Sequence, residues 1–70
     1  MEHKHRLIIQ TNGKNYLSSP LGIAKCFVLY TQAVLAKTFA QPFAMISHDG
    51  IRYIYTGEMM ENAEVRWAEM

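Results

Sequence analysis

The stretch PLGIAKCFVLYTQAVLAKTF, residues 20–39, is the most apolar segment of the chain and decides its fold. Ser18-Ser19 before Pro20 is typical of a helix start, because serine caps free amides and proline at the first helical position gives up only an unpaired donor. Gln41-Pro42 ends the helix, since the residue before a proline is disfavoured in the helical region. The sequence therefore predicts one long helix from Pro20 to about Phe39 or Ala40.

Both sides of this predicted helix are apolar. At about 100° per residue, one stripe holds mainly large side chains and is predicted to pack on a sheet: Ile23, Ala24, Phe27, Thr31, Val34 and Leu35, with Tyr30 at the edge. The opposite side holds smaller apolar residues among Gly22, Lys25, Gln32 and Lys37. Small residues allow close helix approach, so we expect a homodimer interface there, formed by Cys26, Leu29, Ala33 and Ala36.

Two turn dipeptides flank the helix. Asn12-Gly13 and Asp49-Gly50 each lie between apolar segments and suit the type I′ turn of a two-residue β-hairpin. A two-residue loop also sets the register of the strands. In the first hairpin Ile9 is predicted to face Tyr16 and Ile8 to face Leu17; in the second, Ile46 faces Tyr53 and Met45 faces Ile54.

Residues 58–70 allow two interpretations. Met59, Ala63, Trp67 and Met70 lie at helical spacing, whereas Ala63, Val65 and Trp67 alternate with Glu64, Arg66 and Ala68 as in an edge strand. We favour the strand. Residues 1–70 are then predicted to form a single small α+β domain of two layers, with one long helix across an antiparallel sheet of four to five strands.

Composition limits the function classes. The 70 residues are 50% apolar, carry a formal charge of +1 and include one cysteine, Cys26. A lone cysteine excludes an internal disulfide framework and indicates a reducing compartment, so we expect a cytoplasmic protein. Lys25, Gln32 and Lys37 interrupt the apolar stretch, so no membrane span is expected.

The charge is unevenly distributed along the chain. Residues 1–42 have five basic residues against one acidic residue (+4), and residues 43–70 have two against five (−3). The basic set defines an alternative function, a small nucleic-acid-binding accessory domain: Lys4, Arg6, Lys14, Lys25 and Lys37. Nucleic-acid binders concentrate positive charge on one face. These residues spread over three predicted elements, so this alternative ranks second.

Motifs for catalysis and metal binding are missing from the sequence. It has no glycine-rich phosphate loop, no paired cysteines, no glycine-flanked serine and no metal-binding helix signature. His3 and His5 lie at a chain end without rigid geometry, and His48-Asp49 lacks a nucleophile and a pocket. We therefore expect a non-enzymatic protein with no catalytic residue, no metal and no cofactor.

Aromatic residues indicate where a protein partner binds. In the expected register, Tyr53 and Tyr55 share a face with Ile46, opposite Phe43, Met45 and Ile54. If the helix covers the second face, the tyrosines form an open patch of the composition found at protein recognition sites. The predicted partner-binding residues are Tyr53, Tyr55, Arg52 and Trp67. The reverse orientation, with both tyrosines in the core, fits the pattern equally well.

The whole layout resembles that of several small phage or mobile-element proteins, including some anti-CRISPR inhibitors. The features that carry the resemblance are Leu7 to Leu17 around Asn12-Gly13, the helix from Pro20, and Phe43 to Tyr55 around Asp49-Gly50. It covers most of the chain and is architectural, with no family motif matched residue by residue. It implies inhibition of a host defence complex by occlusion, without chemistry. The layout is also similar to toxin- and antitoxin-sized RNA-binding domains, whose usual basic surface is missing here.

Overall fold

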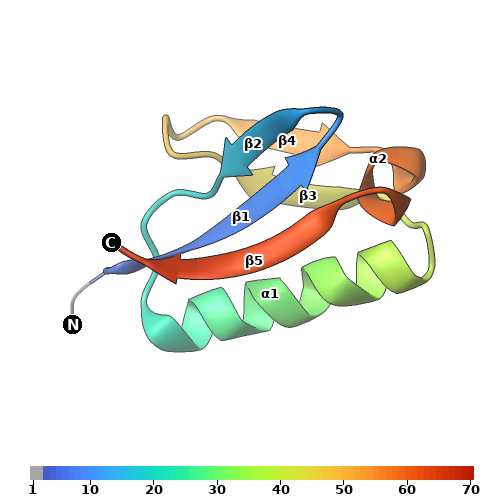
Figure 1. Cartoon of the computed structure of the whole chain (residues 1–70). Coiled ribbons are helices and arrows are strands. Elements are labelled where there is room, and N and C mark those ends of the chain that lie inside the picture. Colours follow the sequence, from blue (N-terminus) through green and yellow to red (C-terminus); the bar gives the residue numbers. More distant parts are fainter. Residues whose placement is uncertain (1–2) are drawn as a thin grey trace.

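The computed structural model describes residues 3–70 and has seven elements in that range. Their order is β1 (His5–Thr11), β2 (Lys14–Leu17), α1 (Ile23–Thr38), β3 (Phe43–Ile46), β4 (Arg52–Tyr55), α2 (Gly57–Glu61) and β5 (Glu64–Glu69). One antiparallel sheet has the order β2-β1-β5, and β3 and β4 form a second. Figure 1 shows α1 running along β5 and β1, with β3 and β4 behind them. The predicted α+β class with one long helix is confirmed, but the strands form two sheets instead of one.

The first hairpin has the predicted geometry. Asn12 and Gly13 both have positive φ, 54° and 73°, as a type I′ turn requires. Ile9 faces Tyr16 and Ile8 faces Leu17, so the predicted register is confirmed. Alternate residues of β1 then point into the core, and Leu7, Ile9 and Thr11 are buried.

The predicted register of the second hairpin is wrong by one residue. Met45 faces Tyr53 instead of Ile54, and Ile46 faces Arg52 instead of Tyr53. The loop has three residues, 48–50, because the Ser47 amide bonds to the Ile51 carbonyl and only Gly50 in the loop has a positive φ, 85°. That is the type I turn with a glycine bulge. A slip of one residue moves every side chain to the other face, so Tyr53 and Tyr55 lie on the inner face with Phe43 and Met45.

The two sheets meet at a bridge between Ser18 and Ser47. The Ser18 hydroxyl is buried there, accepts a bond from the Leu7 amide (2.8 Å) and donates one to the Ser19 carbonyl (2.9 Å). The prediction that Ser18 caps the helix is therefore wrong. The chain turns away at Pro20, Leu21 pairs with His5, and α1 starts after Gly22 without a side-chain cap.

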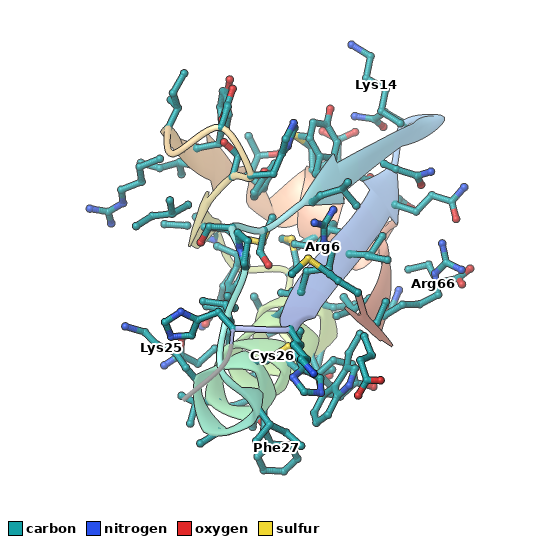
Figure 2. All side chains as sticks on the ribbon, turned by 90° about the vertical axis from the view of Figure 1, so that its left-hand side faces the viewer. Arg6, Lys14, Lys25, Cys26, Phe27 and Arg66 are labelled. Carbon is teal, nitrogen blue, oxygen red and sulfur yellow. The ribbon has the colours of Figure 1, made fainter. Side chains whose placement is uncertain are left out.

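The predicted orientation of α1 is reversed. Its buried residues are Cys26, Ala33 and Ala36, and Leu29 and Tyr30 are partly buried. Phe27 is 57% exposed, and Ile23, Thr31, Val34 and Leu35 also face solvent. Figure 2 shows Cys26 between the helix and the sheets and Phe27 projecting away from them. Large side chains from the rest of the fold already fill the core: Leu7, Ile9, Phe43, Met45, Tyr55 and Met60. The inner side of α1 therefore carries small side chains, which allow the helix backbone to lie close to the sheets.

The end of α1 packs tightly against α2. Ala40 has a positive φ of 50°, and the Gln41 amide bonds to the Ala36 carbonyl at 2.9 Å, which is a Schellman ending. A Cβ on Gly57 would lie only 2.1 Å from the Ala40 carbonyl oxygen, so a larger residue does not fit at this position. The favoured strand is present as β5, and the alternative of a helix that extends to Trp67 and Met70 is wrong. The helical part is the short α2, which the Thr56 hydroxyl caps.

Candidate functional site

A broad apolar surface of α1 faces solvent. Six large side chains on it are between 36% and 63% exposed: Ile23, Phe27, Val28, Val34, Leu35 and Phe39. We call this set the α1 apolar face. A helix that packs on one side normally carries polar residues on the other side. Contiguous exposed apolar area of this kind is typical of an interaction surface.

The polar groups within the α1 apolar face are turned onto the helix itself. Thr31 donates its hydroxyl to the Phe27 carbonyl at 3.0 Å, and Thr38 donates to the Val34 carbonyl at 2.9 Å. These hydroxyls are already hydrogen-bonded without an outside partner. Lys25 and Lys37 each lie about 120° around the helix from Thr31, since a residue advances about 100°. The centre of the face is therefore uncharged.

An aromatic cluster continues this surface onto β5. Trp67 is 37% exposed, and its ring meets those of Phe27 (6.0 Å), Tyr30 (6.1 Å) and His5 (6.0 Å) edge to face. We call these four residues the Trp67 cluster. Edge-to-face geometry is a favourable arrangement of aromatic rings. The cluster therefore joins α1 to β5 with a partly exposed aromatic surface.

The four predicted partner-binding residues do not form one patch. Tyr55 is 3% exposed and belongs to the core, so the predicted open aromatic patch is wrong. Tyr53 is 44% exposed on the same strand face, whereas Arg52 and Ile46 lie on the other face of their sheet. Trp67 lies on β5, in the other sheet, beside α1. Of the four, Trp67 adjoins the α1 apolar face.

Tyr55 is buried in a setting that raises its pKa. Burial is the main cause, and the neighbouring Tyr16 and Tyr53 hydroxyls add to it. The Tyr16 and Tyr55 rings pack edge to face at 5.0 Å, and the Tyr55 hydroxyl is buried without a hydrogen-bond partner in the described part of the chain. Both rings, with Tyr53 and Asp49, line a cavity of about 250 Å³. We assign the tyrosine pair to packing between β2 and β4.

The predicted dimer interface lies inside the protein. Cys26 and Ala33 are fully buried, Ala36 is 6% exposed and Leu29 is half-buried. None of these side chains is available to form the centre of an interface with a second copy. Burial also raises the pKa of the Cys26 thiol, so the thiol stays protonated at neutral pH.

The basic residues proposed for nucleic-acid binding do not share a face. Figure 2 shows Lys14 and Lys25 at opposite ends of the molecule, with Arg6 between the two. The Lys37 ammonium donates to the carbonyl oxygens of Glu61 and Ala63, so it fastens α1 to the end of α2. Arg6 is partly buried and donates to the Met70 sulfur. This dispersion gives no continuous track for a phosphate backbone.

The His48-Asp49 pair has a structural explanation. The Asp49 carboxylate accepts hydrogen bonds from the Ser47 hydroxyl and the Ile51 amide, which fixes the three-residue loop. The bond from Ser47 is the main cause that lowers the pKa of this carboxyl. Within residues 3–70, no three His, Cys, Asp or Glu side chains come close enough together to hold a metal ion.

Comparison with known proteins identifies no relative. No family model matches the chain, and no curated protein or solved structure is significantly similar to it. In the part of the chain that the structure describes, no helix is long and apolar enough to cross a membrane.

The sequence pattern does not predict the α1 apolar face, because large apolar side chains normally indicate the buried side of a helix. The signal that identifies the true inner side is the run of small residues, Cys26, Ala33 and Ala36, with Gly22 at the start. From the sequence alone, that run indicates close approach to another protein copy. The same property allows close approach to the chain's own sheets.

Proposed function

We propose that this chain is a non-enzymatic protein-interaction module that pairs with a second copy through the α1 apolar face and the Trp67 cluster. The observation that carries the proposal is the exposure of six large apolar side chains on one side of a single helix. The predicted homodimer is thus kept with a different interface. A cytoplasmic location and a host defence complex as a further target, which the architectural resemblance implies, stay predictions.

The exposed area supports this pairing. Side chains of this size offer roughly 200 Å² each, so six that are about half exposed contribute roughly 600 Å². Trp67 and the partly buried Tyr30 bring the total near the roughly 800 Å² per partner of a standard interface. Isolated monomers seldom expose an apolar patch larger than about 300–600 Å².

The charge distribution also favours self-association. A two-fold interface uses the same surface on both copies, so a charged side chain at its centre would lie close to the same charged side chain of the second copy. The centre of the α1 apolar face is uncharged, and the two lysines of α1 lie on its flanks. Like-charge repulsion is therefore kept out of the middle of the proposed dimer.

Sedimentation equilibrium over a range of concentrations tests the proposal. The wild-type chain is expected to dimerise, and Leu35→Glu is expected to weaken dimerisation about a thousandfold, because the change enters a two-fold interface twice at about 2 kcal/mol each. Leu35 is 51% exposed, so the monomer should remain folded by circular dichroism. Gln32→Glu introduces the same charge on the flank of the same helix and should have little effect.

Two results would contradict the proposal. One is a wild-type chain that stays monomeric at every concentration, and the other is a Leu35→Glu variant that dimerises as well as Gln32→Glu. Steeply salt-dependent binding to generic duplex DNA or RNA, lost in Lys14→Glu, would favour the nucleic-acid-binding accessory domain instead.

A further inference from the structure

A second surface, distinct from the α1 apolar face, is a groove between α1 and β3. It has a volume of about 370 Å³ and an apolar floor formed by Leu21, Leu29 and Met45. Lys25 of α1 and Arg52 of β4 lie among its lining residues, and none of those residues is acidic. The volume falls within the range of pockets that hold small ligands or peptide side chains.

The groove runs along the free edge of β3. β3 pairs with β4 on one side only, and the Ser47 amide bonds to the Ile51 carbonyl of that pairing. Bonding alternates along an antiparallel ladder, so the N–H and C=O groups of Ala44 and Ile46 point away from β4. The Ile46 carbonyl confirms this direction, because it accepts the Ser19 amide at 2.9 Å. Ile46 is therefore already paired on this edge, and Ala44 is the residue of β3 whose outward groups stay open.

Pro20 explains why the edge stays open. Ser19 is the last residue of the preceding segment that bonds to β3, and at Pro20 the chain leaves β3. Leu21 pairs with His5 on β1 instead, with bonds of 2.7 Å and 3.0 Å. The position opposite Ala44 is therefore vacant of backbone, and the Ala44 N–H and C=O groups face the groove.

Charge and shape together specify what fills the groove. Lys25 and Arg52 are both exposed, and neither has an ion-pair partner among residues 3–70. Two cations beside an apolar floor favour a ligand with a carboxylate next to an apolar side chain. Unpaired edge groups favour a ligand with its own extended backbone.

We propose that this groove binds an extended, acidic peptide segment of a partner protein, which adds to β3 as a further strand. The backbone of the segment bonds to the N–H and C=O groups of Ala44, an apolar side chain rests on Leu21 and Leu29, and a carboxylate lies between Lys25 and Arg52. This is strand addition, in which the main chain supplies affinity and alternate side chains supply specificity. The groove is separate from the dimer face, so the inference does not rest on self-association.

Fluorescence anisotropy with short labelled peptides tests this site. A peptide of alternating valine and glutamate is expected to bind, and one of alternating valine and lysine is not. Arg52→Glu and Lys25→Glu should each weaken binding about tenfold. Lys14→Glu is the matched control, because Lys14 is an exposed lysine at the opposite end of the molecule.

Backbone methylation of the peptide separates strand addition from general charge attraction. Two versions of the acidic peptide carry N-methyl groups on alternate residues, so that only one version loses the N–H groups that face β3. That version should lose binding, and the other should keep most of it. Amide hydrogen exchange should show new protection at Ala44 when the unmethylated peptide is added.

Three results would overturn the inference. They are the absence of binding by the acidic peptide, equal binding by both methylated versions, and an equal loss in Lys14→Glu and Arg52→Glu. The measurement is repeated in the monomeric Leu35→Glu variant, where binding should persist. Failure of the groove and failure of the proposed dimer are therefore distinguishable.

Discussion

The orientation of α1 can be tested by two substitutions that have opposite consequences in the two possible orientations. Phe27 is 57% exposed, so less than half of a side chain of roughly 200 Å² is buried by the fold. At about 25 cal/mol per Å² its loss in Phe27→Ala costs at most about 2 kcal/mol. A core phenylalanine would cost about 3–5 kcal/mol.

Ala33→Leu gives the complementary measurement. Ala33 is 0% exposed and belongs to the core with Leu7, Ile9 and Phe43, so a larger side chain must displace its neighbours. Overpacking of this kind costs about 1–3 kcal/mol. If Ala33 faced solvent instead, the change would be nearly neutral, because alanine and leucine have similar helix propensities.

The assay is urea and thermal unfolding by circular dichroism, with both changes made in the Leu35→Glu background so that dimerisation does not alter apparent stability. For a domain of this size, 1 kcal/mol shifts the midpoint by about 4–8 °C. We expect Ala33→Leu to lower the midpoint at least as much as Phe27→Ala does. A loss of about 3–5 kcal/mol in Phe27→Ala together with a neutral Ala33→Leu would refute the orientation and the α1 apolar face with it.

Two further predictions test the packing inside the fold. Gly57→Ala should lower the thermal midpoint although alanine is the better helix former, because its Cβ would lie 2.1 Å from the Ala40 carbonyl oxygen; a raised midpoint would contradict the close contact between α1 and α2. Cys26 should react with iodoacetamide much more slowly in the native protein than in urea, because it is 0% exposed and burial raises its pKa. Equal rates in the two conditions would place the thiol on the surface.

Local signals predicted the elements that depend on short-range geometry. Asn12-Gly13 permits positive φ at both turn positions, and that turn alone sets the register of β1 and β2. Asp49-Gly50 resembles it in composition, but the Asp49 carboxylate bonds to Ser47 and Ile51 and thereby stabilises a longer loop. The difference lies in a side-chain contact that the dipeptide does not reveal. The longer loop shifts the register by one residue, so Tyr55 lies in the core instead of on the predicted open face.

The orientation of the helix could not be deduced from apolar periodicity, because both sides of residues 23–38 are apolar. The choice depends on how much space the sheets leave. Leu7, Ile9, Phe43 and Met45 already fill the space between the sheets, so the helix contributes small residues and its large ones remain outside. A pattern within one element does not contain the volume contributed by the others.

The positions of the two proposed surfaces on α1 allow both to be occupied at once. Lys25 lines the groove. Thr31 lies at the centre of the α1 apolar face, and a rotation of about 100° per residue places Lys25 about 120° around the helix from it. Leu29 is half-buried and faces the groove on the same side. A second copy that covers Phe27 and Leu35 therefore leaves Lys25 accessible, and a dimer would present two peptide grooves. Two grooves on one particle favour partners with repeated acidic segments, because the second contact forms at high effective concentration once the first has bound.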